Sequence, residues 1–458
     1  MNKAATDWIF YILLLITQII ACFFYGFYHK HIQAGDPKAP IVAASAGLYP
    51  WFQDIHIMVF VGMGFLFAFL KRFRLTGITE VFWIAAITVQ YYFLWTALFD
   101  GAWAKPKVWG DFNTSFGDLI RGEFCAISMI IAIGAVIGKT NNLQQLIIVI
   151  VGILIYSINE HILFVSLDVS DVGGSMYIFA FGAFYGIGAS WLLNYAEAKN
   201  NHNYVTSINS NSFAMIGTLF LWCFFPSFNS ARAADVFAQN RAVVNTYFCL
   251  IGSVLGAYLI SKILHKGKYH MEHILNATLV GGVLIASGAD ILGESWIAYL
   301  VGFLAGIISA LMFRYWAGIL NKLGLVDVAG VFHTFGVPGI VGTCLSAIYR
   351  ARYFPGDERR GGIQIAGIAI SFALSLVGGL LVGLIVRFLG SYETHDEYYN
   401  DQTTAHFDDP VEYNQNPQPF YDSQRRLIFG HVHQRKVYNN PIGEENRYVN
   451  DREAAPNL

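Results

Sequence analysis

The sequence predicts an all-α, polytopic membrane protein of about twelve spanning helices that is built from an internal repeat. Three observations lead to this fold class. The chain has 458 residues, of which 55% are hydrophobic and only 13% charged, whereas soluble domains carry about 25% charged residues. Twelve apolar runs are long enough to cross a hydrocarbon core of about 30 Å. One short pattern occurs twice, and each copy opens a long apolar run.

The repeated pattern is an Asp followed by a Gly-containing turn and, eight residues after the Asp, by a Phe. The first copy contains Asp171 and Phe179, and the second, 156 positions later, contains Asp327 and Phe335. Asp is a good helix N-cap and suits the positive end of the helix dipole. Eight helical residues span about 12 Å, so an Asp at the membrane surface places its Phe near the midplane. Two half-structures that meet there are typical of internally repeated transporters.

The apolar runs follow one another along most of the chain. The first, 8–28, contains bulky residues and offers no small-residue cleavage site near its end, so we expect a retained helix rather than a signal peptide. The other runs are 51–70, 79–99, 118–138, 144–163, 173–194, 213–231, 244–264, 272–292, 296–315, 328–349 and 363–389.

The basic residues indicate how the chain is oriented in the membrane. Lysines and arginines at 71–74 and 262–268 follow the second and eighth runs, which predicts cytoplasmic termini under the positive-inside rule. The arginines at 350–360 argue the other way, although acidic residues lie among them. Cytoplasmic termini place Asn113 outside, in the triplet Asn-Thr-Ser of a glycosylation acceptor.

Residues 391–458 differ in character from the apolar domain 1–390. They are polar and carry twelve acidic and six basic side chains. This composition predicts a cytoplasmic, largely disordered tail. We expect the tail to be dispensable for membrane insertion, because the apolar helices hold the buried surface.

Several classes of function are excluded by what the sequence lacks. No basic patch points to a nucleic acid. The five cysteines form no CxxC pair, and no metal cluster is apparent. No Ser-His-Asp set or phosphate-binding loop appears either, so we expect neither an enzyme nor a cofactor.

Five motifs resemble the Rh branch of the ammonium transporter (Amt/Mep/Rh) superfamily, and they occur in order over about residues 8–390. They are YPWFQDIHIMVF at 49–60, DVGGSM at 171–176, FAMIGTLFLW at 213–222, PSFNSA at 226–231 and NATLVGG at 276–282. The resemblance implies a homotrimer in the plasma membrane, with one pore per protomer, an inverted repeat around that pore, and ammonium, ammonia or carbon dioxide as permeant.

The resemblance also implies roles for individual residues. Phe124 and Phe228 are similar to the stacked aromatic pair that closes the outer mouth of the pore, and Asp171 and Asp327 to the acidic residues at the pore helices. From the residues alone, helix capping by these carboxylates is favoured over attraction of a cation. The family's two pore histidines, which bind the substrate and relay its proton, are replaced here by Phe179 and Phe335.

Two other histidines lie in or near these motifs and are candidates to substitute for the missing pair. His333 lies two residues from Phe335, a helical rotation of about 200°, so it is expected to face away and to be satisfied by a neighbouring carbonyl. His56 and Asp54 begin the second apolar run. Interfacial capping and packing is the favoured interpretation of both, ahead of a role in the pore.

Two classes of function remain open. A pore centre without imidazoles opposes passage of a bare cation, whose desolvation costs tens of kcal/mol, whereas a neutral polar molecule loses about 4–8 kcal/mol at worst. This favours a channel for neutral ammonia or carbon dioxide. The alternative is a non-conducting, trimeric membrane scaffold that presents its tail to cytoplasmic proteins.

Overall fold

The computed structural model describes residues 3–27, 29–30, 47–103, 112–193, 195, 198, 201–354, 358–390, 392 and 394–406. It is helical except for one parallel pair of two-residue strands, β1 (His29–Lys30) and β2 (Phe112–Asn113). The uninterrupted long helices are α1 (Lys3–Phe27), α5 (Leu75–Trp103), α6 (Phe116–Gly134), α10 (Ile208–Ser230), α11 (Val236–Leu264), α14 (Ser295–Lys322) and α16 (Glu358–Arg387).

Four further spans change helical type along their length, each including a π-helical turn. The first joins α3 (Tyr49–Ile57), the π-helix η1 (Met58–Met63), α4 (Gly64–Leu66) and the 3-10 turn η2 (Phe67–Phe69); the others join α7 (Asn142–His161) to η3 (Ile162–Ser166), η4 (Ser175–Ala180) to α8 (Phe181–Leu192), and η5 (Phe332–Gly336) to α15 (Val337–Tyr353). Such π-turns occur frequently at functional sites.

The prediction of about twelve helices is confirmed, although not all of them are simple spans. Ten helical segments of the described chain are long and apolar enough to cross a membrane. The run at 118–138 becomes α6, which carries Asp118, Arg121 and Glu123 near its start. The run at 272–292 is broken into α12 (Met271–Asn276) and α13 (Val280–Ile285).

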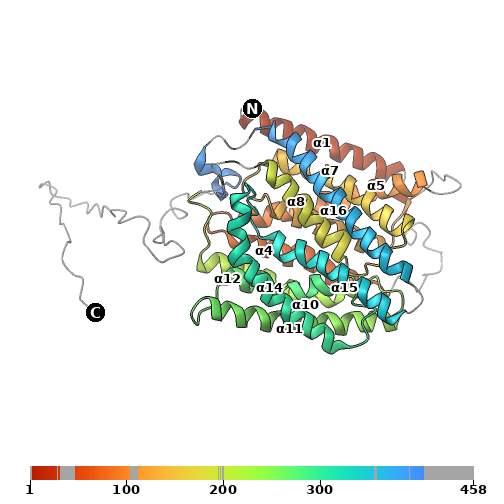
Figure 1. Ribbon diagram of the computed structural model, residues 1–458. Coiled ribbons are helices and arrows are strands. Elements are labelled where there is room, and N and C mark those ends of the chain that lie inside the picture. The colour runs from red at the N-terminus through yellow and green to blue at the C-terminus, as the bar shows by residue number, and fades with distance from the viewer. Residues whose placement is uncertain are drawn as a thin grey trace, which may run out of the picture. The chain divides into compact units, whose positions relative to one another are not determined.

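Small residues let the long helices approach each other closely. Figure 1 shows α11 beside α14 and α8 beside α16, and both pairs pack along their lengths. In the first pair, a Cβ added to Gly252 would press on the carbonyl oxygen of Tyr299, so the crossing depends on glycine. Close backbone approach at small residues is the usual way in which membrane helices associate.

The C-terminal part of the described chain packs with the helices beyond residue 390, where the sequence predicted a boundary. The first compact unit runs to Ala405, and residues 394–406 include two short 3-10 turns, η6 (His395–Glu397) and η7 (Asp401–Thr403). Tyr398 and Tyr399 are fully buried, and the Tyr399 N–H donates to the Gly138 carbonyl at 2.9 Å. Residues 407–458 of the predicted tail lie outside the described residues.

Candidate functional site: a column of phenylalanine rings

The two copies of the sequence repeat fold into the same local structure. Gly174 and Gly330 have positive φ angles of 80° and 69°, which turn the chain into the π-helical segments η4 and η5. The Asp171 carboxylate accepts the backbone N–H groups of Met176 and Tyr177 at 2.8 and 3.0 Å. Asp327 does the same one residue earlier in its copy, at 3.0 and 2.9 Å. The capping role is therefore present in both halves.

Asp171 has a further partner from another part of the chain. The Ser287 hydroxyl also donates to its carboxylate, and only 3% of the residue is exposed. Burial raises the pKa of Asp171 above its usual value, against the opposing effect of the Ser287 hydroxyl and the backbone donors. Asp171 thus holds the entry turn of η4 against the segment that follows α13.

The two Phe residues of the repeat meet in the core, as the sequence predicted. The rings of Phe179 and Phe335 are stacked, with centroids 5.9 Å apart and planes at 10°. Phe228 lies 5.5 Å from Phe179, and Phe124 lies 4.4 Å from Phe228. At most 3% of any of these four residues is exposed. They form a continuous column, which we call the phenylalanine column.

A cavity of about 370 Å³ reaches the Phe335 end of this column. Its wall includes Tyr204, Thr206 and Asn211, from and just before the first turn of α10. Phe228 lies close to the other end of α10, which is 23 residues and so about 35 Å long. The column therefore runs from this cavity toward Glu123, and we name its two ends the Tyr204 mouth and the Glu123 mouth.

The Glu123 mouth contains a histidine–carboxylate contact that the sequence did not indicate. His56 Nδ1 lies 2.7 Å from Glu123 Oε1, and only 4% of the Glu123 side chain is exposed. Glu123 directly precedes Phe124 of the column. Its second oxygen, Oε2, has no hydrogen-bond partner among the described residues. A buried carboxylate oxygen of this kind favours a cation beside it.

The structure shows the packing expected for the start of the second apolar run, where the His56 ring lies 5.4 Å from Phe52 and 4.7 Å from Phe60, and adds specific partners. His56 caps no helix: its imidazole pairs with Glu123, which is 67 positions away. Asp54 accepts a hydrogen bond of 2.6 Å from the hydroxyl of Ser227, the neighbour of Phe228. Both residues therefore lie close to Glu123 and Phe228. No local signal in the sequence links them to their partners.

His333 is buried, as expected, but it is not satisfied by a carbonyl. Its Nδ1 has no hydrogen-bond partner in the described part of the chain. The ring packs against Phe313 at 4.9 Å and Phe332 at 5.3 Å. His333 therefore packs among neighbouring rings and does not replace a pore histidine at Phe335.

The Tyr204 mouth adds groups that the sequence did not single out. The Tyr204 hydroxyl donates to the Val328 carbonyl at 2.9 Å, next to Asp327. His270 and Glu272 also line the cavity, with His270 Nδ1 3.8 Å from Glu272 Oε2. The Tyr204 mouth thus carries a few polar groups and an acidic group within a mostly apolar lining, whereas the column itself is aromatic.

Lys139 is a buried lysine close to Asp327, and the effect of this environment on its pKa can be measured. Its ammonium donates to Ser190 Oγ at 2.7 Å and to the Val326 carbonyl at 2.8 Å. Burial lowers the pKa of Lys139 to about 7, and the charge of Asp327 opposes this only in part. The unfolded chain keeps the ordinary lysine pKa of about 10.4.

We expect the stability of the protein to rise with pH between about 7 and 10 relative to that of Lys139→Met. In this window the unfolded state binds a proton that folded Lys139 has released, so the free energy of unfolding increases by up to about 1.4 kcal/mol per pH unit. Thermal unfolding of both proteins in detergent at pH 7, 8 and 9 measures the difference. Parallel pH profiles would show that Lys139 keeps its proton in the folded state.

The glycosylation prediction at Asn113 is not tested by the structure. Asn113 belongs to β2, beside Lys30 of β1, and its side chain lies outside the described residues.

The chain is similar in sequence to one family of known proteins along most of its length. Residues 14–410 match the model of the Ammonium Transporter Family. The ammonium transporter Rh type C of Xenopus tropicalis is 39% identical over 363 residues, covering 74% of this chain and 77% of that protein. The Rh type A transporter of Bos taurus is 39% identical over 342 residues, covering 74% of this chain and 79% of the relative.

Solved structures resemble the chain as well. Rh50 of Nitrosomonas europaea, described as one of the Rhesus protein family of channels, superimposes with a TM-score of 0.72 at 28% identity, over 82% of this chain and 96% of Rh50. Mep2 of Saccharomyces cerevisiae shares the fold, with a TM-score of 0.64 at 17% identity, over 80% of this chain and 93% of Mep2.

Proposed function

The chain belongs to the ammonium transporter family, in its Rh branch, and on that premise we propose that it is a membrane channel for ammonium and ammonia in which only a neutral molecule crosses the pore centre. Proteins of this family are channels and transporters rather than enzymes. Ammonia is the expected permeant, and carbon dioxide is the other neutral candidate.

One observation supports the proposal: Phe179 and Phe335, at the positions that resemble the two pore histidines of the family, stack against each other. A bare cation held between such rings loses its hydration, at a cost of tens of kcal/mol. Cation–π attraction to the rings offsets only about 0.5–2 kcal/mol of this desolvation cost. A neutral molecule loses about 4–8 kcal/mol at worst, so the column selects against charge.

The Glu123 mouth supports recruitment of ammonium before this step. Glu123 offers its unpartnered Oε2, and Phe124 and Phe228 offer ring faces. Ammonium attracted there transfers its proton to bulk water on the same side, and the neutral ammonia then enters the column. We assign the Glu123 mouth to the outer side of the plasma membrane, with cytoplasmic termini, and the assembly to a homotrimer of the type expected for the family.

Electroneutral flux is the expected result for the unmodified protein in proteoliposomes. An ammonium gradient should raise the internal pH faster than in protein-free vesicles, without an ammonium-dependent current, because no histidine pair relays the proton or shelters the cation. Internal pH is read with a trapped dye, and current is read on a supported membrane. An ammonium current well above that of protein-free membranes would refute charge exclusion at the column.

The double substitution Phe179→His with Phe335→His should introduce an ammonium-dependent current. It restores two groups that can hold ammonium and pass its proton, at positions where the parent rings already stack. Phe332→His is the matched control, since it places one imidazole in the same π-helical segment beside Phe184. Equal currents from both variants would mean that the paired position has no special role.

A non-conducting scaffold is the second candidate, and the same column favours it. Successive ring centroids lie 4.4, 5.5 and 5.9 Å apart, within the range of direct aromatic contact. The column is therefore closed along its length unless the rings move. If neither ammonia nor carbon dioxide enters faster than in protein-free vesicles, the scaffold is the better account.

A further inference from the structure

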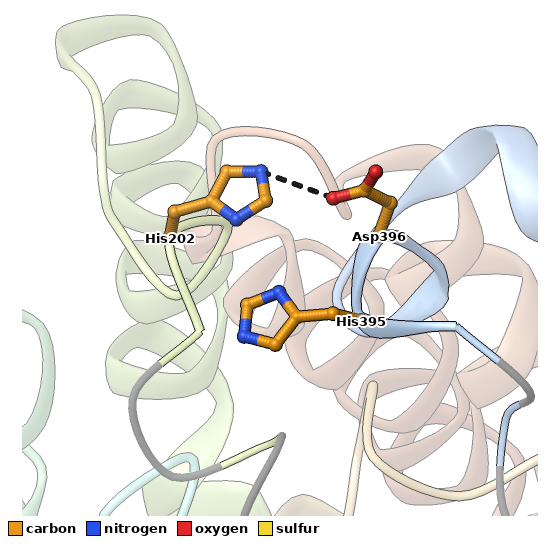
Figure 2. Close-up of side chains that lie close together, drawn as sticks. All are labelled: His202, His395 and Asp396. Carbon is orange, nitrogen blue, oxygen red and sulfur yellow. Dashed lines mark ion pairs between the residues drawn. The ribbon is translucent and has the colours of Figure 1, made fainter.

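Two histidines and an aspartate from distant parts of the chain meet beside the Tyr204 mouth. Figure 2 shows His202 facing Asp396, with the ring of His395 beside them. His202 Nε2 lies 3.6 Å from Asp396 Oδ1. The two imidazoles are nearly parallel, at 7°, with centroids 5.5 Å apart. One ligand atom from each of the three residues lies within 4.8 Å of the other two.

Neighbouring asparagines fix the backbone that carries these side chains. Asn201 Nδ2 donates to the His395 carbonyl at 2.6 Å. Asn203 Nδ2 donates to the Tyr398 carbonyl at 3.1 Å, and the Asn203 N–H donates to Asn201 Oδ1 at 2.8 Å. The segment before α10 is therefore bonded to the C-terminal segment on either side of Asp396. The three ligands are brought together by this scaffold, although they are themselves exposed.

We propose that His202, His395 and Asp396 form a divalent transition-metal site, with zinc as the expected ion. Two imidazole nitrogens and one carboxylate oxygen are a donor set that zinc accepts, with water in the remaining position. Zinc ligands lie about 2.0–2.2 Å from the metal, so the three atoms need only draw together by rotation of exposed side chains. Copper and nickel prefer the same nitrogen ligands.

A metal ion bound at this site links two segments of the chain beside the Tyr204 mouth. We call this metal-dependent link the clamp. One segment contains His202 and Tyr204, whose hydroxyl bonds Val328 and whose ring lies 5.2 Å from that of Tyr399. The other contains His395 and Asp396, three residues before Tyr399. An ion shared by both segments therefore holds residues 394–406 against the Tyr204 mouth. This inference does not depend on which molecule the pore conducts.

Zinc titration of the full-length protein in detergent, against a competing chromophoric chelator, tests the site. We expect the unmodified protein to bind one zinc per chain at this site. H202A/H395A should lack this zinc, and D396A should bind it at least roughly tenfold more weakly. His431→Ala with His433→Ala is the matched control, since it removes two histidines of the C-terminal sequence and leaves the cluster intact. Unchanged binding by H202A/H395A, or its loss in the control, overturns the proposal.

Hydrogen exchange tests the clamp separately from binding. Zinc should slow exchange of the backbone amides in 394–406 in the unmodified protein and leave it unchanged in H202A/H395A. Without zinc the two proteins should unfold at the same temperature, because the substituted side chains are exposed. Zinc that binds without slowing exchange in this segment would show an ordinary surface ion site and no clamp.

Discussion

Removal of residues 391–458 should destabilise the helical bundle, whereas removal of 407–458 should leave its stability unchanged. The difference is the segment 394–406. The Asp401 carboxylate accepts the backbone N–H groups of Arg74 and Thr76 at 3.1 and 2.9 Å, at the start of α5. Tyr398 and Tyr399 are buried, and each large apolar side chain contributes about 1.5–3 kcal/mol by burial. The longer truncation therefore loses several kcal/mol.

Thermal unfolding and size-exclusion chromatography of the two truncated proteins in detergent provide the measurement. Asp401→Ala in the full-length chain is the point control, and it should reproduce part of the loss because it leaves the first N–H groups of α5 without their acceptor. Full-length stability after both truncations would restore the initial expectation that the whole of 391–458 is dispensable. A loss of the same size after both truncations would assign the role to 407–458.

Asp171→Ala should prevent folding or lower stability by several kcal/mol. The change leaves the N–H groups of Met176 and Tyr177 and the Ser287 hydroxyl without their acceptor in a buried site. Each unsatisfied buried donor costs about 1–3 kcal/mol, which is a large share of a total stability of about 5–15 kcal/mol. Expression level and unfolding temperature measure the effect.

Asp171→Asn separates hydrogen bonding from charge in this position. Asparagine keeps one acceptor oxygen and nearly the same shape, so it should be much less harmful to folding than alanine. Asp168→Asn is the matched control: Asp168 is exposed and has a φ of 55°, which asparagine tolerates. If Asp171→Asn folds but loses ammonia flux, the carboxylate acts electrostatically; full flux would assign it to capping alone.

The sequence alone determined the fold class, most spans and the paired Asp–Phe pattern. Spanning helices follow from the length and composition of local apolar runs, because the bilayer leaves few alternatives for the backbone. The turns at Asp171 and Asp327 are also local, since each carboxylate bonds backbone groups four to six positions later. The two copies of this pattern, together with the resemblance to the Rh branch, predicted that Phe179 and Phe335 meet.

Only the tertiary structure decided which residues surround Phe179 and Phe335. His56 and Glu123 are 67 positions apart, and His202 and Asp396 are 194 positions apart, so no periodicity reports their contact. The same limit applies to the segment after 390. Residues 394–406 are polar in composition, and the burial of Tyr398 and Tyr399 depends on loops from distant parts of the chain, at Gly138 and Asn203, which bond the backbone of these two residues. A polar segment is buried only where other groups satisfy its hydrogen bonds. Here those groups come from distant segments that meet only in the folded bundle.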